Sequence, residues 1–138
     1  MSRFRIVLGL IAGGILVASS AAHSFLGWTQ LRAALVRSQA PPDLVAGLAV
    51  GWHFAGVAML TFGCIVIWLF TDALRSRPVS LLPAAIIAFV YVVFGIGALI
   101  VSAGNPFFFV FIVPGLMLFV ASSWPATAPS LDGSADEV

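Results

Sequence analysis

The only two histidines of the chain, His23 and His53, both lie inside long apolar stretches. An ionisable side chain in a membrane segment is expensive to bury, so it commonly marks a functional site. Imidazole nitrogens bind haem iron, zinc and copper, take up protons near neutral pH, and form hydrogen bonds. The two histidines are therefore the first candidates for chemistry in this chain.

Four apolar segments contain or accompany these histidines: residues 4–28, 45–73, 81–102 and 106–123. Each is close to the ~20 residues that cross a ~30 Å hydrocarbon layer as a helix, and none alternates as a barrel strand does. The composition agrees, because 62% of the residues are hydrophobic and only 8% are charged, unlike a soluble protein. The sequence predicts an all-α fold, a four-transmembrane-helix bundle in one domain, residues 1–124, with a disordered acidic tail, residues 125–138.

The connections between the segments support this division. Residues 29–44 form a polar linker, in which the stretch LRAALVR could make a short interfacial helix. Residues 72–78 carry charges and a proline that separate the second helix from the third. Asn105 and Pro106 suit the N-cap and the first position of the fourth helix, which Pro114 is expected to kink.

The arginines predict the orientation. One side of a four-pass chain would hold Arg3, Arg5, Arg75 and Arg77, and the other side Arg32 and Arg37. The positive-inside rule then places the N- and C-termini on the cytoplasmic side, in what we expect to be a bacterial plasma (inner) membrane. The expected partner is the lipid bilayer, and a net charge of +1 argues against nucleic acid. Neither a protein partner nor an oligomeric state can be read from these residues.

The first segment also fits a secretory signal peptide. Arg3 and Arg5 precede an apolar run that ends with the small residues Ser20 and Ala22, which is the pattern of a cleaved leader. Cleavage after Ala22 would leave three helices and make His23 the new N-terminus, where an amine and an imidazole could bind copper. An uncleaved first membrane helix is the alternative.

The two histidines are expected at similar depth near the outer face. His23 precedes Trp28 by ~7.5 Å of helix, and His53 follows Val45 by ~12 Å, on consecutive antiparallel helices. Small and polar residues share their faces, so both imidazoles should point at neighbouring helices. Tyr91 lies in mid-membrane, where its hydroxyl should find an interhelical partner. The candidate polar site comprises His23, His53, Ser20, Ser24, Trp52 and Tyr91.

Three interpretations of the histidine pair remain open. In the first, each imidazole forms a hydrogen bond of ~0.6 kcal/mol between helices, and the protein is an accessory or structural membrane subunit. In the second, His23 and His53 bind a metal ion or haem; two ligands leave a zinc site incomplete but suffice for haem iron. In the third, they line a path for protons or a small solute. The sequence shows no nucleophile with a base and an orienting acid, so it does not predict an enzyme.

The stretches AAHSFLGW, residues 21–28, and GWHFAGVAML, residues 51–60, carry a family resemblance. An HSxLG segment at the end of the first helix, followed by a WH pair in the second, resembles a group of small uncharacterised bacterial four-helix membrane proteins. The resemblance implies the same four-pass fold and marks five positions: His23, Ser24, Gly27, Trp52 and His53. Trp28 stands where those proteins often carry an acid, and no biochemical activity comes with the resemblance.

Overall fold

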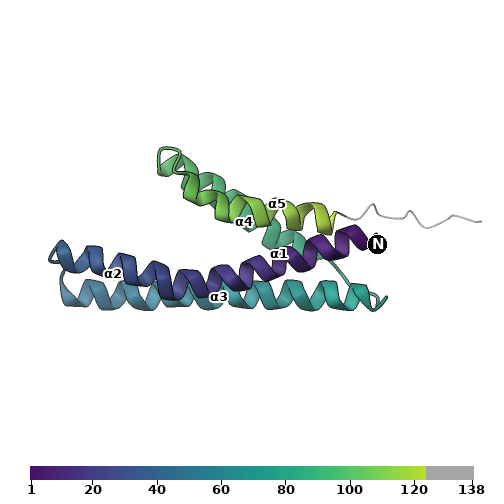
Figure 1. Cartoon of the computed structure of the whole chain (residues 1–138), viewed down its shortest axis with the longest axis horizontal. Coiled ribbons are helices and arrows are strands. Elements are labelled where there is room, and N and C mark those ends of the chain that lie inside the picture. The colour runs from purple at the N-terminus through teal and green to yellow at the C-terminus, as the bar shows by residue number, and fades with distance from the viewer. Residues whose placement is uncertain (124–138) are drawn as a thin grey trace, which may run out of the picture.

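The structure, a computed structural model, describes residues 1–123, so the expected disordered tail lies outside the described residues. The described part is all-α, and its elements form two antiparallel hairpins (Figure 1). In chain order the elements are α1 (Arg3–Ala21), η1 (Ala22–Gly27), α2 (Trp28–Arg37), α3 (Pro42–Leu74), α4 (Leu82–Val101), η2 (Pro106–Phe108) and α5 (Phe109–Ser122). η1 is a turn of π-helix and η2 a turn of 3-10 helix.

The long hairpin consists of α3 and one continuous helix of 35 residues, Arg3–Arg37, that includes α1, η1 and α2. Both helices are longer than the sequence analysis predicted, because most of the expected linker, residues 29–44, is helical. The stretch LRAALVR contains good helix formers and no glycine or proline, so the first helix continues through it. Pro42 begins α3 at a position where no backbone N–H is needed.

Glycines allow α1 and α3 to approach closely. A Cβ atom on Gly63 would lie 2.9 Å from the backbone nitrogen of Val17 and 3.1 Å from the carbonyl oxygen of Gly13. Apolar side chains gain little by moving from lipid to protein, so close van der Waals contact is a main source of helix association in membranes. Because Gly13 and Gly63 have no side chains, the backbones of α1 and α3 approach closely and make these contacts.

The short hairpin consists of α4 and α5, which also meet at glycines. A Cβ on Gly95 would lie 3.1 Å from the backbone nitrogen of Ile112, and one on Gly115 would lie 3.1 Å from that of Val92. Between the helices, the Asn105 side chain accepts a hydrogen bond from the backbone N–H of Phe107. Asn105 is thus the N-cap that the sequence predicted, although the first turn after it is 3-10 rather than α.

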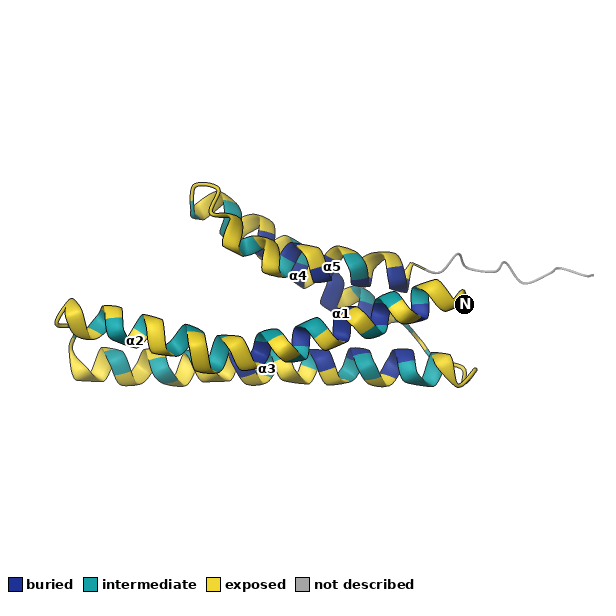
Figure 2. Ribbon diagram, in the orientation of Figure 1, coloured by how far each residue is buried: buried dark blue, intermediate teal, exposed yellow. Residues whose placement is uncertain are grey.

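The buried core lies where the two hairpins meet. Its largest fully buried side chains are Leu16 of α1, Val66 and Phe70 of α3, and Leu118 of α5. Figure 2 shows the buried residues gathered toward the end of the hairpins that holds the N-terminus, while the other ends diverge. Leu16 belongs to this core, so cleavage after Ala22 would remove a core side chain. The half of the long hairpin that contains α2 has no helix of the short hairpin beside it (Figure 1).

Three helices of the described chain are long and apolar enough to cross a membrane: Arg3–Arg37, Pro42–Leu74 and Leu82–Val101. The fourth apolar helix, Pro106–Ser122, is shorter and contains Pro114 within α5. Large side chains that face outward are mostly apolar, among them Phe89 of α4 and Phe119 of α5. Such surfaces suit lipid rather than water, and the fold is that of an integral membrane protein.

Candidate functional site

The π-turn η1 carries the whole HSxLG segment. It spans Ala22–Gly27 within an otherwise α-helical rod, and it contains His23 and Ser24. One extra residue per turn shifts the side chains that follow relative to the helix before it, and such turns are frequent at functional sites. η1 therefore decides how His23 and the residues after it face α3.

His23 and Trp52 bind each other in two directions. The imidazole Nε2 of His23 lies 3.1 Å from the carbonyl oxygen of Trp52, and the indole Nε1 of Trp52 donates to the carbonyl oxygen of His23 at 2.8 Å. Their rings are stacked, with centroids 4.2 Å apart and planes 6° from parallel. A carbonyl oxygen can only accept, so Nε2 of His23 is the donor in this contact.

The glycine of the HSxLG segment makes room for this pair. A Cβ on Gly27 would lie 2.9 Å from Cζ2 of the Trp52 indole, closer than ordinary van der Waals contact. A larger residue at position 27 would therefore push the indole away from His23. The structure thus gives a physical reason for a glycine at this place in the segment.

Trp28 and His53 form a second contact between a tryptophan ring and a histidine ring, with the two residue types exchanged between the helices. Trp28 lies on the first helix and His53 on α3, and their ring centroids are 5.6 Å apart with planes tilted by 59°. His53 is exposed, whereas Trp28 is half-buried. Each histidine is therefore in contact with a tryptophan from the opposite helix, and the four rings join η1 and the start of α2 to the middle of α3.

Ser20 and Ser24 extend the contact toward the core. The buried hydroxyl of Ser20 donates to the carbonyl oxygen of Gly56 at 2.8 Å. The Ser24 hydroxyl occupies the space that a Cβ on Gly56 would fill. Gly56 thus lets the serine face of the first helix lie directly on the backbone of α3.

A small cleft of about 230 Å³ opens beside His23, between the two hairpins. Its aromatic lining comes from both hairpins: Phe62 of α3, Tyr91 and Phe94 of α4, and Phe111 of α5. The Tyr91 ring lies 5.9 Å from the Phe111 ring and 6.5 Å from the Phe62 ring. The buried Tyr91 hydroxyl has no hydrogen-bond partner among the described residues, so the interhelical partner expected from the sequence is not found there.

The six residues of the candidate site thus fall into two groups. Ser20, Ser24, His23, Trp52 and His53 belong to the contact between the first helix and α3, while Tyr91 lies across the cleft on α4. His23 lines the cleft, but His53 is not among its lining residues. No group of three histidine, cysteine or acidic side chains in residues 1–123 is arranged to hold a metal ion.

Two features of the site were missed by sequence reasoning. Trp28 was not among the candidate site residues, although it packs against His53. The cleft aromatics Phe62 and Phe94 carried no signal in the sequence, because phenylalanine is common throughout the apolar segments. The sequence did contain one sign of this pairing. His23 and Trp28 lie near each other on the first helix, and Trp52 and His53 are adjacent on the second, so antiparallel packing can bring each histidine against a tryptophan.

Comparison of the chain with protein-family models, with curated proteins and with solved structures finds no match.

Proposed function

We propose that this chain is a four-pass integral membrane protein with both termini on the cytoplasmic side. Its hydropathy supports at least three crossings, and the short apolar helix Pro106–Ser122 returns alongside α4 to the end where α1 begins (Figure 1). Arg3, Arg5, Arg75 and Arg77 all lie toward that end, which supports a cytoplasmic position for it.

The length of the long hairpin supports the inference that part of it lies outside the hydrocarbon layer of the membrane. Its helices of 35 and 33 residues correspond to about 50 Å, whereas the hydrocarbon layer is ~30 Å thick. A helix tilted by ~40° still has only about 39 Å inside the layer. About 22 residues, or ~33 Å, separate Trp52 from the end of α3 at Leu74. The His–Trp contact would then lie near the outer interface, the level that tryptophan prefers.

Within that membrane protein, the histidines join helices. The observation that carries this role is the reciprocal contact of His23 with Trp52, in which ring stacking is combined with two hydrogen bonds to backbone carbonyls. The imidazole Nε2 of His23 and the indole Nε1 of Trp52 both have partners within the chain. This favours an accessory or structural membrane subunit over a protein whose histidines converge on an ion.

The outer part of the long hairpin offers this subunit a surface for a partner. Val50 and Phe54 of α3 are each 73% exposed, and Leu44 is 51% exposed. Val50 and Phe54 are four residues apart and share one face of α3, and an exposed apolar face can mark an interaction site. The partner supported by this surface is another membrane protein with an apolar face at the outer interface.

Haem is the second candidate, and the described residues do not fit it. Of the two histidines, only His23 lines the cleft, and its Nε2 already contacts the carbonyl oxygen of Trp52. A cleft of about 230 Å³ is below the ~300–1,000 Å³ of pockets for ligands of drug size. The apolar aromatic lining likewise gives little support to a path for protons or small polar solutes.

Thermal unfolding in detergent distinguishes helix joining from ligand binding. We expect His23→Ala to lower the midpoint equally in EDTA and with added zinc, copper or haemin, because the lost contact is within the chain. A ligand or metal that raises the midpoint of the wild-type protein, with the rise lost in both His23→Ala and His53→Ala, would overturn this role. A haem Soret band in the purified protein would do the same.

Cysteine labelling tests the topology. In a Cys64→Ala background, Arg37→Cys should react with a membrane-impermeant maleimide on intact cells, and Arg75→Cys only after permeabilisation. The reverse pattern would overturn the orientation, and labelling of both positions from outside would overturn the crossing by α3.

A photoreactive residue at Val50 tests the accessory role. We expect one discrete crosslinked protein in membranes, with no such product from the matched lipid-facing position Val93 of α4. Identification of the product by mass spectrometry separates a second copy of this chain from a different membrane protein. Crosslinking to lipid alone at Val50 would contradict the role.

A further inference from the structure

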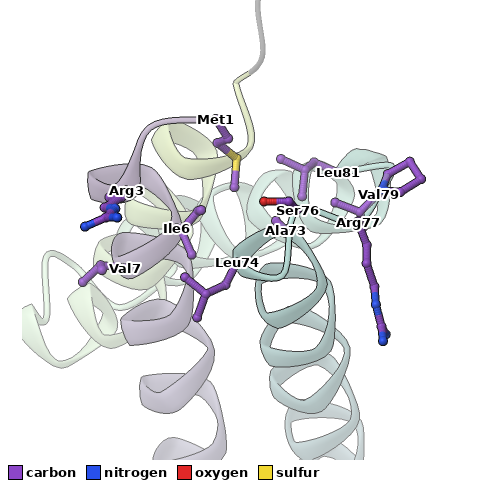
Figure 3. Close-up of a pocket in the computed structure, with 11 residues that line it drawn as sticks. Met1, Arg3, Ile6, Val7, Ala73, Leu74, Ser76, Arg77, Val79 and Leu81 are labelled. Carbon is purple, nitrogen blue, oxygen red and sulfur yellow. The ribbon is translucent and has the colours of Figure 1, made fainter.

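The end of the bundle that carries the N-terminus contains a second cavity, of about 1040 Å³. It lies between the start of α1, the end of α3 and the connection to α4 (Figure 3). It shares no lining residue with the cleft beside His23. Its properties are therefore independent of the histidines.

The part of this cavity nearest the bundle is apolar. Its walls include Ile6 and Val7 of α1, Leu74 of α3, and Leu81 just before α4. In Figure 3 the side chains of Ile6 and Leu74 lie between α1 and α3. Val7 and Leu74 remain more than half exposed, at 52% and 56%. A hydrocarbon chain placed here would cover apolar surface that the protein itself leaves open.

The rim of the cavity is basic. Arg3 and Arg77 are lining residues, and Figure 3 shows them on opposite flanks. Arg77 pairs with Asp72 at 3.0 Å, yet its side chain stays 60% exposed and accessible to another anion. Asp72 is the only acid at this end among residues 1–123, because the other described acid, Asp43, lies in the first turn of α3.

The backbone adds to this positive charge. α1 begins at Arg3 with no side-chain cap and no acidic residue in its first turn. The N-terminal end of a helix carries a positive partial charge and attracts anions. Arg5 and Arg75 are also near this end, so among residues 1–123 basic side chains outnumber acidic ones around the cavity.

We propose that this cavity binds one anionic phospholipid. The acyl chain lies against Ile6, Val7, Leu74 and Leu81, and the phosphate lies at the rim, where the side chains of Arg3 and Arg77 turn inward to meet it. Basic pockets between membrane helices at the cytoplasmic surface recognise lipid headgroups by this combination of charge and apolar wall. A zwitterionic lipid brings its own cation to the rim and gains less. The proposal rests on the membrane insertion in the proposed function, but not on the orientation of the termini.

Binding of fluorescent phosphatidylglycerol and phosphatidylcholine to the purified full chain in detergent tests the proposal. We expect tighter binding of phosphatidylglycerol, and an Arg3→Gln, Arg77→Gln double variant about 30-fold weaker for that lipid, from about 1 kcal/mol for each arginine. The loss of affinity for phosphatidylcholine should be smaller than the loss for phosphatidylglycerol. The matched control is Arg32→Gln, Arg37→Gln, which removes the same charge at the other end and should bind as the wild type does.

Equal losses in the two double variants, or no preference between the lipids in the wild type, would overturn the proposal. Inorganic phosphate that displaces phosphatidylglycerol at comparable concentration would also overturn it, because the site would then recognise a free anion. Leu74→Gln should weaken the binding of both lipids, because it removes part of the apolar wall. If the double variant does not fold, the single variant Arg3→Gln provides the same test. Binding in detergent does not depend on the labelling pattern, so failure of this site and failure of the topology are distinguishable.

Discussion

The contact between the first helix and α3 depends on tryptophan as much as on histidine. Trp52 donates its indole N–H to the backbone of His23 and accepts from the imidazole through its own carbonyl. A backbone carbonyl points in one direction from its helix. Hydrogen bonds from side chains to these carbonyls therefore fix the rotation of each helix about its own axis. Single residues thus set the register at which a 35-residue helix meets α3.

A double-mutant cycle measures this pair. We expect Trp52→Phe to lower the free energy of unfolding in detergent by about 1 kcal/mol, because one hydrogen bond and part of the stacked ring are lost. Combined with His23→Ala it should show a coupling of about 0.5–3 kcal/mol, as contacting residues do. Trp68→Phe is the matched control, because Trp68 is 64% exposed and should add independently of His23→Ala. Full additivity for Trp52→Phe would show that the ring stacking contributes nothing, because each hydrogen bond ends on a backbone carbonyl that the other substitution leaves in place.

Tyr91 offers a second test at the residue scale. Its buried hydroxyl has no hydrogen-bond partner among the described residues, and an unsatisfied buried polar group costs about 1–3 kcal/mol. We therefore expect Tyr91→Phe to raise the free energy of unfolding by about 1 kcal/mol while the ring keeps its contacts. A lower stability of this variant would mean that the hydroxyl has a partner in the folded protein.

The helices are positioned against one another mainly by glycine. At Gly63 the nearest atoms to an added Cβ include backbone atoms of α1, which cannot move aside as a flexible side chain can. At Gly14, an exposed position of α1, an added Cβ would meet nothing within 4 Å. The same residue type therefore has opposite roles at two places in one hairpin.

This difference predicts opposite effects of the same substitution. Gly63→Ala should lower the free energy of unfolding by about 1–3 kcal/mol, because the helices must separate to admit the methyl group. Gly14→Ala should leave it unchanged or raise it by up to about 1 kcal/mol through better helix propensity. Both are measured by unfolding in the same detergent. A similar loss for the two variants would contradict the close approach of α1 and α3.

The whole molecule has its core at one end and open surfaces at the other. Residues from α1, α3, α4 and α5 form a single buried cluster that includes Leu16, Phe70 and Leu118. Beyond it the hairpins diverge, and the His–Trp contact holds only the long hairpin together there. The stability of the fold therefore depends mainly on the end that holds the N-terminus. The short hairpin leaves the half of the long hairpin that contains α2 uncovered.

Two leucines of α5 test this division. Leu118 is 1% exposed in the shared core, whereas Leu116, on the same helix, is 50% exposed. We expect Leu118→Ala to lower the free energy of unfolding by about 2–5 kcal/mol through the cavity it leaves. Leu116→Ala should change it by less than about 0.5 kcal/mol. Comparable losses at both positions would mean that the hairpins do not share this core.

The amino-acid sequence by itself determined the all-α class, the four apolar helices and the cap at Asn105. These follow from local physics, namely apolar length, charge position and capping chemistry, which need no knowledge of neighbours. The continuation of the first helix to Arg37 was not predicted, because a polar linker and a polar helix differ only in what packs beside them. The tertiary structure alone decided the π-turn at His23, the pairing of each histidine with a tryptophan, and the two cavities. Those features depend on which faces of distant segments meet, and in a chain so uniformly apolar many faces are similar until glycine fixes the approach.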